Sequence, residues 1–166
     1  MVPRKYLILV AMASMLISLD QLTKFLVTSR IRPGESLPVL DHFFHLTLVY
    51  NSGAAFGLLS NLSPSIRDPL FFLVPGITLI FVIVVFTRLR ENQQLSIYAL
   101  ALVVGGALGN LMDRIRLGRV VDFLDFHWRH THHFPAFNFA DAAITLGVFL
   151  LFLSVLFERG AEEGSH

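Results

Sequence analysis

Four long apolar stretches constrain this chain more than any other feature of its sequence. They cover about residues 6–27, 70–87, 95–112 and 139–157. The hydrocarbon core of a bilayer, roughly 30 Å thick, is crossed by about 20 helical residues, so each stretch is close to the length of one span. Only 15 % of the residues are charged, whereas soluble domains carry about 25 %. We therefore predict a mainly α-helical, polytopic membrane protein in which residues 1–166 form a single membrane domain.

The first apolar stretch has a basic start and could be mistaken for a secretory signal peptide. It lacks a convincing small-residue cleavage site, and Asp20 and Lys24 follow the apolar run directly, so a retained first helix fits better. The connection 88–94 is short and polar, which predicts an antiparallel hairpin of the second and third helices. The long loops 28–69 and 113–138 then lie on one side of the membrane.

The orientation follows from the positions of lysine and arginine. Basic residues are denser near the helix ends on the side that holds both termini and 88–94, which predicts cytoplasmic termini and extracytoplasmic loops. Arg114 is expected on the outer side, just past the end of the third helix. Within the loops, β-branched and aromatic residues at 42–51 and 119–128 predict strands. These strands would form a small extracytoplasmic β platform at the membrane surface.

Composition excludes several classes of function. The chain has no cysteine, so disulfides, thiolate nucleophiles and cysteine zinc sites are impossible. A formal net charge of +1 gives no case for nucleic-acid binding. Gly105 and Gly109 have the GxxxG spacing that favours close packing of helices in membranes.

Asp20 and Lys24 are the ionisable pair of the first helix. Their i, i+4 spacing places both on one face, where they form an ion pair with a structural role.

Asp122 and Asp141 are the strongest candidates for chemistry. Taken singly, each has a simple structural explanation. Asp141 lies three residues after Asn138 and resembles the acidic member of a helix capping box, while Asp122 is a strand residue with Asp125 as its neighbour. Taken together, two carboxylates at one depth in apolar surroundings share a proton and activate water, which is the chemistry of peptide hydrolysis.

Two other constellations predict chemistry less well. The run 127–133 contains four histidines, which suggests a metal site, but it lacks an HExxH motif and lies in a polar loop. Ser52 or Ser154 with Lys24 would suggest a Ser/Lys hydrolase, but no motif frames either serine. We therefore expect no metal, and we expect no cofactor because a pair of carboxylates that activates water requires none.

Five motifs occur in a fixed order along the chain. They are DQLTK at 20–24, NSGAAFG at 51–57, GGALGNLMDR at 105–114, GRVVDFLDF at 118–126 and FPAFNFADAAITLG at 134–147. Together with the four spans and the loop lengths, they resemble the lipoprotein signal peptidase (signal peptidase II) family over essentially the whole chain. The resemblance implies an aspartic endopeptidase of the bacterial inner membrane. Such an enzyme cleaves diacylglyceryl-modified prolipoproteins before the lipidated cysteine, near the outer face.

The resemblance also implies roles for individual residues, and it places the catalytic aspartates at Asp122 and Asp141. The substrate-binding positions it implies are Asn51, Asn110, Arg114 and Asn138, and we expect Gly53 to leave room for the substrate. The supporting positions are Asp20, Lys24 and Asp113. We also expect a monomer that contacts membrane lipids and binds no nucleic acid.

A small transporter or ion-conducting protein is the main alternative, with Asp20, Asp122 and Asp141 as intramembrane charges. Four spans are few for a transporter, and the sequence shows no inverted repeat. A cargo-binding membrane scaffold is a third possibility, and it would need no paired acids.

Overall fold

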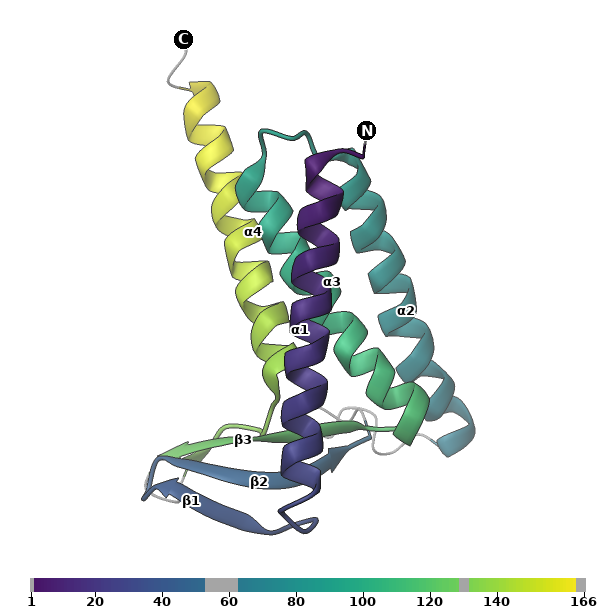
Figure 1. Ribbon diagram of the computed structural model, residues 1–166, viewed down its shortest axis with the longest axis vertical. Helices are drawn as coiled ribbons and strands as arrows, with labels where there is room; N and C mark the ends of the chain where they lie inside the picture. The colour runs from purple at the N-terminus through teal and green to yellow at the C-terminus, as the bar shows by residue number, and fades with distance from the viewer. Residues whose placement is uncertain (1, 53–62, 129–131, 164–166) are drawn as a thin grey trace.

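A computed structural model describes residues 2–52, 63–128 and 132–163. Its four helices are α1 (Arg4–Thr28), α2 (Pro64–Arg88), α3 (Gln94–Leu117) and α4 (Phe139–Glu163). Each contains a segment that is long and apolar enough to cross a membrane. The helices lie side by side, and a small sheet covers one end of them (Figure 1). The predicted fold class, four membrane-spanning helices with a small β platform, is confirmed.

The sheet is antiparallel, with the strands in the order β1-β2-β3-β4. The strands are β1 (Ser36–Leu40), β2 (Phe44–Asn51), β3 (Val120–Trp128) and β4 (His132–His133). The predicted strands at 42–51 and 119–128 correspond to β2 and β3, whereas β1 and β4 were not predicted. The register places Val49 opposite Asp122 and Asn51 opposite Val120, so the end of β2 lies beside the start of β3.

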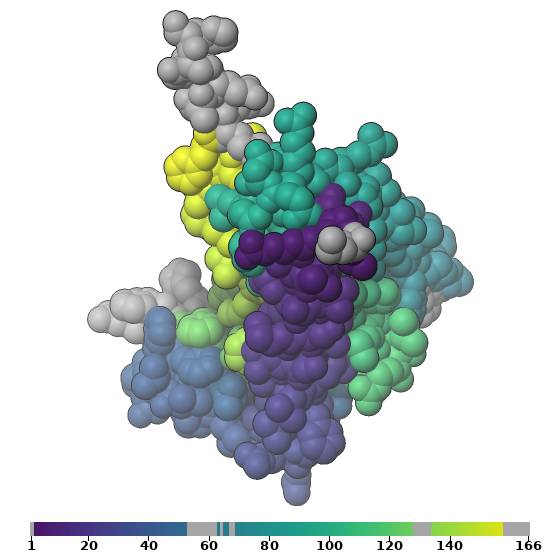
Figure 2. Space-filling model, turned by 45° about the horizontal axis from the view of Figure 1, so that its top comes forward, coloured from purple at the N-terminus to yellow at the C-terminus, as the bar shows by residue number. Residues whose placement is uncertain are grey.

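The helix α3 lies at the centre of the helical layer. It is buried along much of its length, whereas most of α2 is exposed. Glycines allow its close packing: a Cβ atom at Gly105 would lie 3.0 Å from Cα of Ala13 in α1, and one at Gly106 would overlap the carbonyl oxygen of Ala140 in α4. The space-filling view shows α1 across the middle of one face, between α4 and the α2–α3 hairpin (Figure 2).

Three helix boundaries differ clearly from those predicted, and one of them is the end of α4, at Glu163 rather than near residue 157. The third helix was expected to end near residue 112, but α3 continues to Leu117 and ends at Gly118, whose φ of 67° is left-handed. The N–H of Gly118 donates to the carbonyl of Arg114 at 2.9 Å, a helix end that glycine favours. The prediction that Arg114 follows the helix is therefore wrong, because it lies within the last turns of α3. The second helix starts at Pro64 rather than near residue 70.

Candidate active site

Asp122 lies in β3 and is almost completely buried, with 2 % of its surface exposed. Each of its two carboxylate oxygens accepts a hydrogen bond from a side-chain amide. The Nδ2 of Asn138 donates to Oδ1 at 2.7 Å, and the Nδ2 of Asn51, at the end of β2, donates to Oδ2 at 2.9 Å. The strand pair and the start of α4 therefore fix the position of this carboxylate together.

Asp141 lies in the first turn of α4 and forms the predicted capping box with Asn138. The N–H of Asp141 donates to Asn138 Oδ1 at 2.9 Å, and the N–H of Asn138 donates back to Asp141 Oδ2 at 3.3 Å. The other oxygen, Oδ1, accepts a hydrogen bond from Nδ2 of Asn110 in α3 at 2.7 Å. One carboxylate thus takes part both in the helix start and in a side-chain network that extends beyond the helix.

Asn138 joins the two aspartates, since each of them accepts a hydrogen bond from it. Its side chain is fully buried. Besides Asp122, its Nδ2 lies within hydrogen-bond distance of Asn110 Oδ1 at 3.1 Å and of the Val121 carbonyl oxygen at 3.2 Å. The structure therefore brings Asp122, Asp141, Asn51, Asn110 and Asn138 into one connected cluster.

A buried charge network lies against this cluster. Lys24 Nζ contacts Asp20 at 2.8 Å, which is the predicted i, i+4 pair, and also contacts Asp113 at 2.7 Å. It donates to Asn110 Oδ1 at 3.0 Å as well. All three charged side chains are nearly inaccessible to solvent. Lys24 therefore neutralises the charge of two buried carboxylates and orients the amide of Asn110.

The same network positions the backbone around the site. Asp113 Oδ2 accepts the N–H of Val121, next to Asp122, and Asp20 Oδ1 accepts the N–H of Ala140, next to Asp141, each at 3.1 Å. Gln21 was not among the predicted site residues, yet its Nε2 donates to Asp113 Oδ1 at 2.8 Å. Its position next to Asp20 in the DQLTK motif was the available signal.

The remaining residues that the sequence singled out do not all lie in this cluster. Arg114 is half-buried, donates to the carbonyl of Asn110 at 3.3 Å, and is near enough to the aspartates for electrostatic attraction. Gly53 lies outside the described residues. Ser52 is exposed, and Ser154 is buried and accepts a hydrogen bond from Ser96 at 3.0 Å.

Burial also decides the electrostatics of Asp122. Desolvation raises its pKa from an ordinary value of 3.8 to about 6, and the nearby charge of Asp141 acts in the same direction. The hydrogen bonds from Asn51 and Asn138 and the charge of Lys24 oppose this rise. Asp122 therefore holds a proton at a pH where an exposed aspartate would have lost it.

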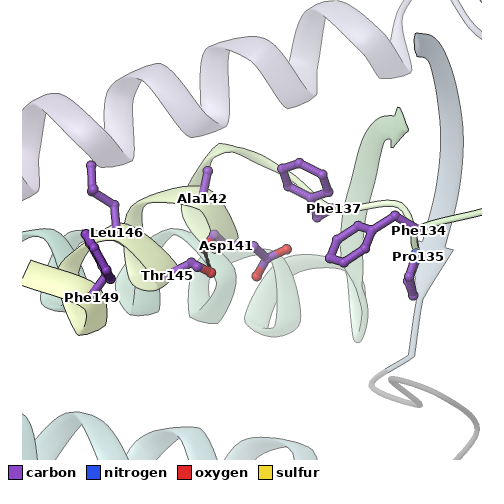
Figure 3. Close-up of a pocket in the computed structure, with 8 residues that line it drawn as sticks. All are labelled: Phe134, Pro135, Phe137, Asp141, Ala142, Thr145, Leu146 and Phe149. Atoms are coloured by element: carbon purple, nitrogen blue, oxygen red, sulfur yellow. Dashed lines mark hydrogen bonds between the residues drawn. The ribbon is translucent and has the colours of Figure 1, made fainter. Parts of the chain in front are cut away.

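An apolar groove of about 850 Å³ opens beside Asp141. It is lined by Phe134, Pro135, Phe137, Asp141, Ala142, Thr145, Leu146 and Phe149. The aspartate lies in the middle of this row, with Phe134 and Phe137 on one side and Leu146 and Phe149 on the other (Figure 3). The groove thus continues from α4 onto the segment before it, and it brings apolar surface next to a carboxylate.

Known proteins resemble this chain over most of its length. A family model described as signal peptidase (SPase) II matches residues 12–157. A lipoprotein signal peptidase of Syntrophotalea carbinolica is 44 % identical and is matched over 90 % of this chain and 91 % of the relative. One of Geobacter sulfurreducens is 48 % identical, over 85 % and 86 %. These relatives give the transporter alternative no support.

Two solved structures of a bacterial membrane enzyme share the fold. Each is 34 % identical to this chain. One has a TM-score of 0.76 and is covered over 92 % of its length, with 89 % of this chain. The other has a TM-score of 0.78 and is covered over 88 %, with 91 % of this chain. With the family match and the curated relatives, these findings show that the chain is a membrane protease of the signal peptidase II family.

Proposed function

We propose that this protein removes signal peptides from diacylglyceryl-modified prolipoproteins as an aspartic endopeptidase, with Asp122 and Asp141 as its catalytic pair. The relatives named lipoprotein signal peptidase support the substrate class. The aspartic mechanism is carried by one observation: both carboxylates are bonded to Asn138, and one of them lines an apolar groove on a membrane-spanning helix.

The reaction requires one ionised and one protonated carboxyl group. The ionised aspartate removes a proton from water while the water oxygen attacks the scissile carbonyl carbon, and the protonated aspartate donates its proton to the carbonyl oxygen. The resulting tetrahedral diol then collapses. A proton passes to the amide nitrogen, the C–N bond breaks, and the products are a carboxyl group on the signal peptide and a free amine on the lipidated cysteine.

The surroundings of the two acids favour different roles. The raised pKa of Asp122, about 6, favours Asp122 as the proton carrier. Asp141 lies in the first turn of α4, where the helix dipole and the N–H of Asn138 favour a negative charge. We therefore assign the ionised resting state to Asp141.

The other predicted residues act around this pair. Asn110 and Asn138 hold the carboxylates. Asn51 lies at the end of β2, and we assign it to the unpaired backbone groups of an extended substrate peptide. Arg114 is assigned to a carbonyl or phosphate-like group of the substrate, and Gly53 to space for its backbone. The buried charge network of Asp20, Lys24 and Asp113 holds the backbone next to both aspartates in position.

The groove beside Asp141 suits a substrate helix that enters from lipid, because its other lining residues carry no charge. We assign the protein to the bacterial inner membrane as a single-domain monomer that contacts lipids and binds no nucleic acid. Both termini are assigned to the cytoplasm, with the sheet and the active site near the outer face. A pair of carboxylates that activates water requires no cofactor.

Cleavage of a diacylglyceryl-modified prolipoprotein by the detergent-purified protein tests this proposal. The product is sized for wild type, Asp122→Asn, Asp141→Asn and Asp41→Asn, the last being a control at an exposed turn between β1 and β2. We expect cleavage before the lipidated cysteine in wild type and control, a loss on the order of 10²–10⁴-fold in each catalytic variant, and no effect of a chelator. Undiminished activity of either catalytic variant would rule out the carboxylate pair.

A further inference from the structure

Three side chains of metal-ligand type converge on the strand pair β2–β3. His45 in β2 lies directly opposite Asp125 in β3. His127 follows two residues later in β3, so it shares a face of the strand with Asp125. One ligand atom from each of the three lies within 4.8 Å of the others. The register of the two strands thus brings His45 next to Asp125 and His127.

The distances and burial of this group suit a bound ion. His127 Nδ1 lies 3.9 Å from Asp125 Oδ1, and the side chains are 0 % and 18 % exposed. The imidazole centroids of His45 and His127 are 4.3 Å apart, with the ring planes at 81°. A zinc ion about 2.0–2.2 Å from nitrogen and oxygen ligands holds any two of them within about 4.2 Å. The His127–Asp125 distance already meets this limit, and small side-chain rotations bring in the third ligand.

We propose that His45, Asp125 and His127 bind one divalent transition-metal ion of the Zn²⁺ type. Two imidazoles and one carboxylate are a ligand set that such ions use in proteins, with a further coordination position open to water. The Oγ of Ser36 lies 3.0 Å from Nδ1 of His45. With this hydroxyl on Nδ1, His45 presents Nε2 to the ion, which is the arrangement common for metal-bound histidine.

The site is separate from the peptidase centre. Asp125 follows Asp122 by three residues in β3, and side chains at an odd spacing point to opposite faces of a strand. The carboxylate of Asp122 is bonded to Asn138 and Asn51 instead. An ion at the new site joins β2 to β3 and stabilises the sheet without entering the cleavage reaction.

Zinc binding to the full-length, detergent-purified protein, free of any polyhistidine tag, tests the proposal. Equilibrium dialysis against Zn²⁺ with elemental analysis gives the stoichiometry, and the visible spectrum of the Co²⁺-loaded protein reports the coordination. We expect one tightly bound ion per chain and a rise in Tm on adding Zn²⁺. The variants His45→Asn and Asp125→Asn should each weaken Zn²⁺ binding at least about tenfold and lose the rise in Tm.

Two controls make the result specific. His42→Asn removes an exposed histidine at a φ of 62°, a conformation that asparagine tolerates, and should leave Zn²⁺ affinity unchanged. Joint replacement of His130, His132 and His133 by asparagine should also leave it unchanged. Absence of stoichiometric binding, unchanged affinity in His45→Asn and Asp125→Asn, or loss of binding in the His130/His132/His133 triple variant would each overturn the proposal.

Discussion

Asn138 and Asp141 exchange two hydrogen bonds across the first turn of α4, at 2.9 and 3.3 Å. This capping box is not an alternative to a role in the active site, because the same two side chains also bond Asp122 and Asn110. The start of the helix and the position of the carboxylate pair are one arrangement. Substitutions that preserve the cap while removing the outward bonds can therefore separate helix stability from cleavage.

Asn138→Ser is such a substitution. Serine is also a good N-cap residue, so the first turn of α4 should be kept, but the amide that Asn138 donates to Asp122 is lost. A misplaced carboxylate of this kind should reduce the rate of prolipoprotein cleavage on the order of 10²-fold. Circular dichroism should show unchanged helix content, and Asn92→Ser, in the exposed α2–α3 connection, should cleave normally. Full activity of Asn138→Ser would mean that the cap alone matters.

Lys24→Met should destabilise the protein strongly. The substitution leaves Asp20 and Asp113 buried without the cation that now contacts both, and breaking a buried pair in this way costs about 3–5 kcal/mol of unfolding free energy. Thermal unfolding in detergent measures the change. The double variant Asp20→Asn/Lys24→Met, which removes one of the stranded charges, should recover part of the loss. A stability equal to wild type would show that the network is not structural.

The unfolding free energy of wild type should fall as the pH rises from about 4 to about 7. The folded pKa of Asp122, about 6, is above its ordinary value of 3.8, so the folded state binds more protons in this window and loses that advantage as Asp122 ionises. The difference corresponds to about 3 kcal/mol. Unfolding curves of wild type and Asp122→Asn at several pH values isolate this contribution, because the variant lacks it. Parallel pH profiles would contradict the raised pKa.

Gly106→Ala should destabilise the contact between α3 and α4, because a Cβ atom there would overlap the carbonyl oxygen of Ala140. Moving the backbone apart costs about 1–3 kcal/mol. Gly76→Ala is the matched control: it lies within α2 with no atom within 4 Å of a Cβ, and it should be neutral or stabilising by up to about 1 kcal/mol. Equal Tm changes in the two variants would show that close packing at Gly106 is unimportant.

Most of the fold was predictable because the long apolar stretches directly indicate the membrane-spanning helices. The end of α3 was not, because Asp113 and Arg114 were taken from the sequence as polar residues beyond the membrane. In the folded chain, Asp113 and Asn110 are buried against Lys24, and this tertiary compensation leaves no local signal. The strand β1 was missed for a related reason, since its residues are all exposed and its strand character comes from pairing with β2.

The candidate site, like the fold, was predictable from the sequence only in part. The motifs indicated Asp122, Asp141 and the asparagines around them, but only the fold shows that the side chain of Asn138 reaches Asp122 and Asn110. The histidine run at 127–133 drew attention to metal binding within one loop. The partner that the structure supplies for His127 is instead His45, far away in the sequence on the neighbouring strand.

The bond from the N–H of Ala140 to Asp20 joins residues 120 positions apart, and it links the first helix to the last. During biosynthesis, a chain interrupted after β3 would contain Asp122 but neither Asn138 nor Asp141. The carboxylate pair is therefore completed only when the final span is inserted, so ribosome-bound and prematurely terminated chains should carry no partial peptidase activity into the membrane.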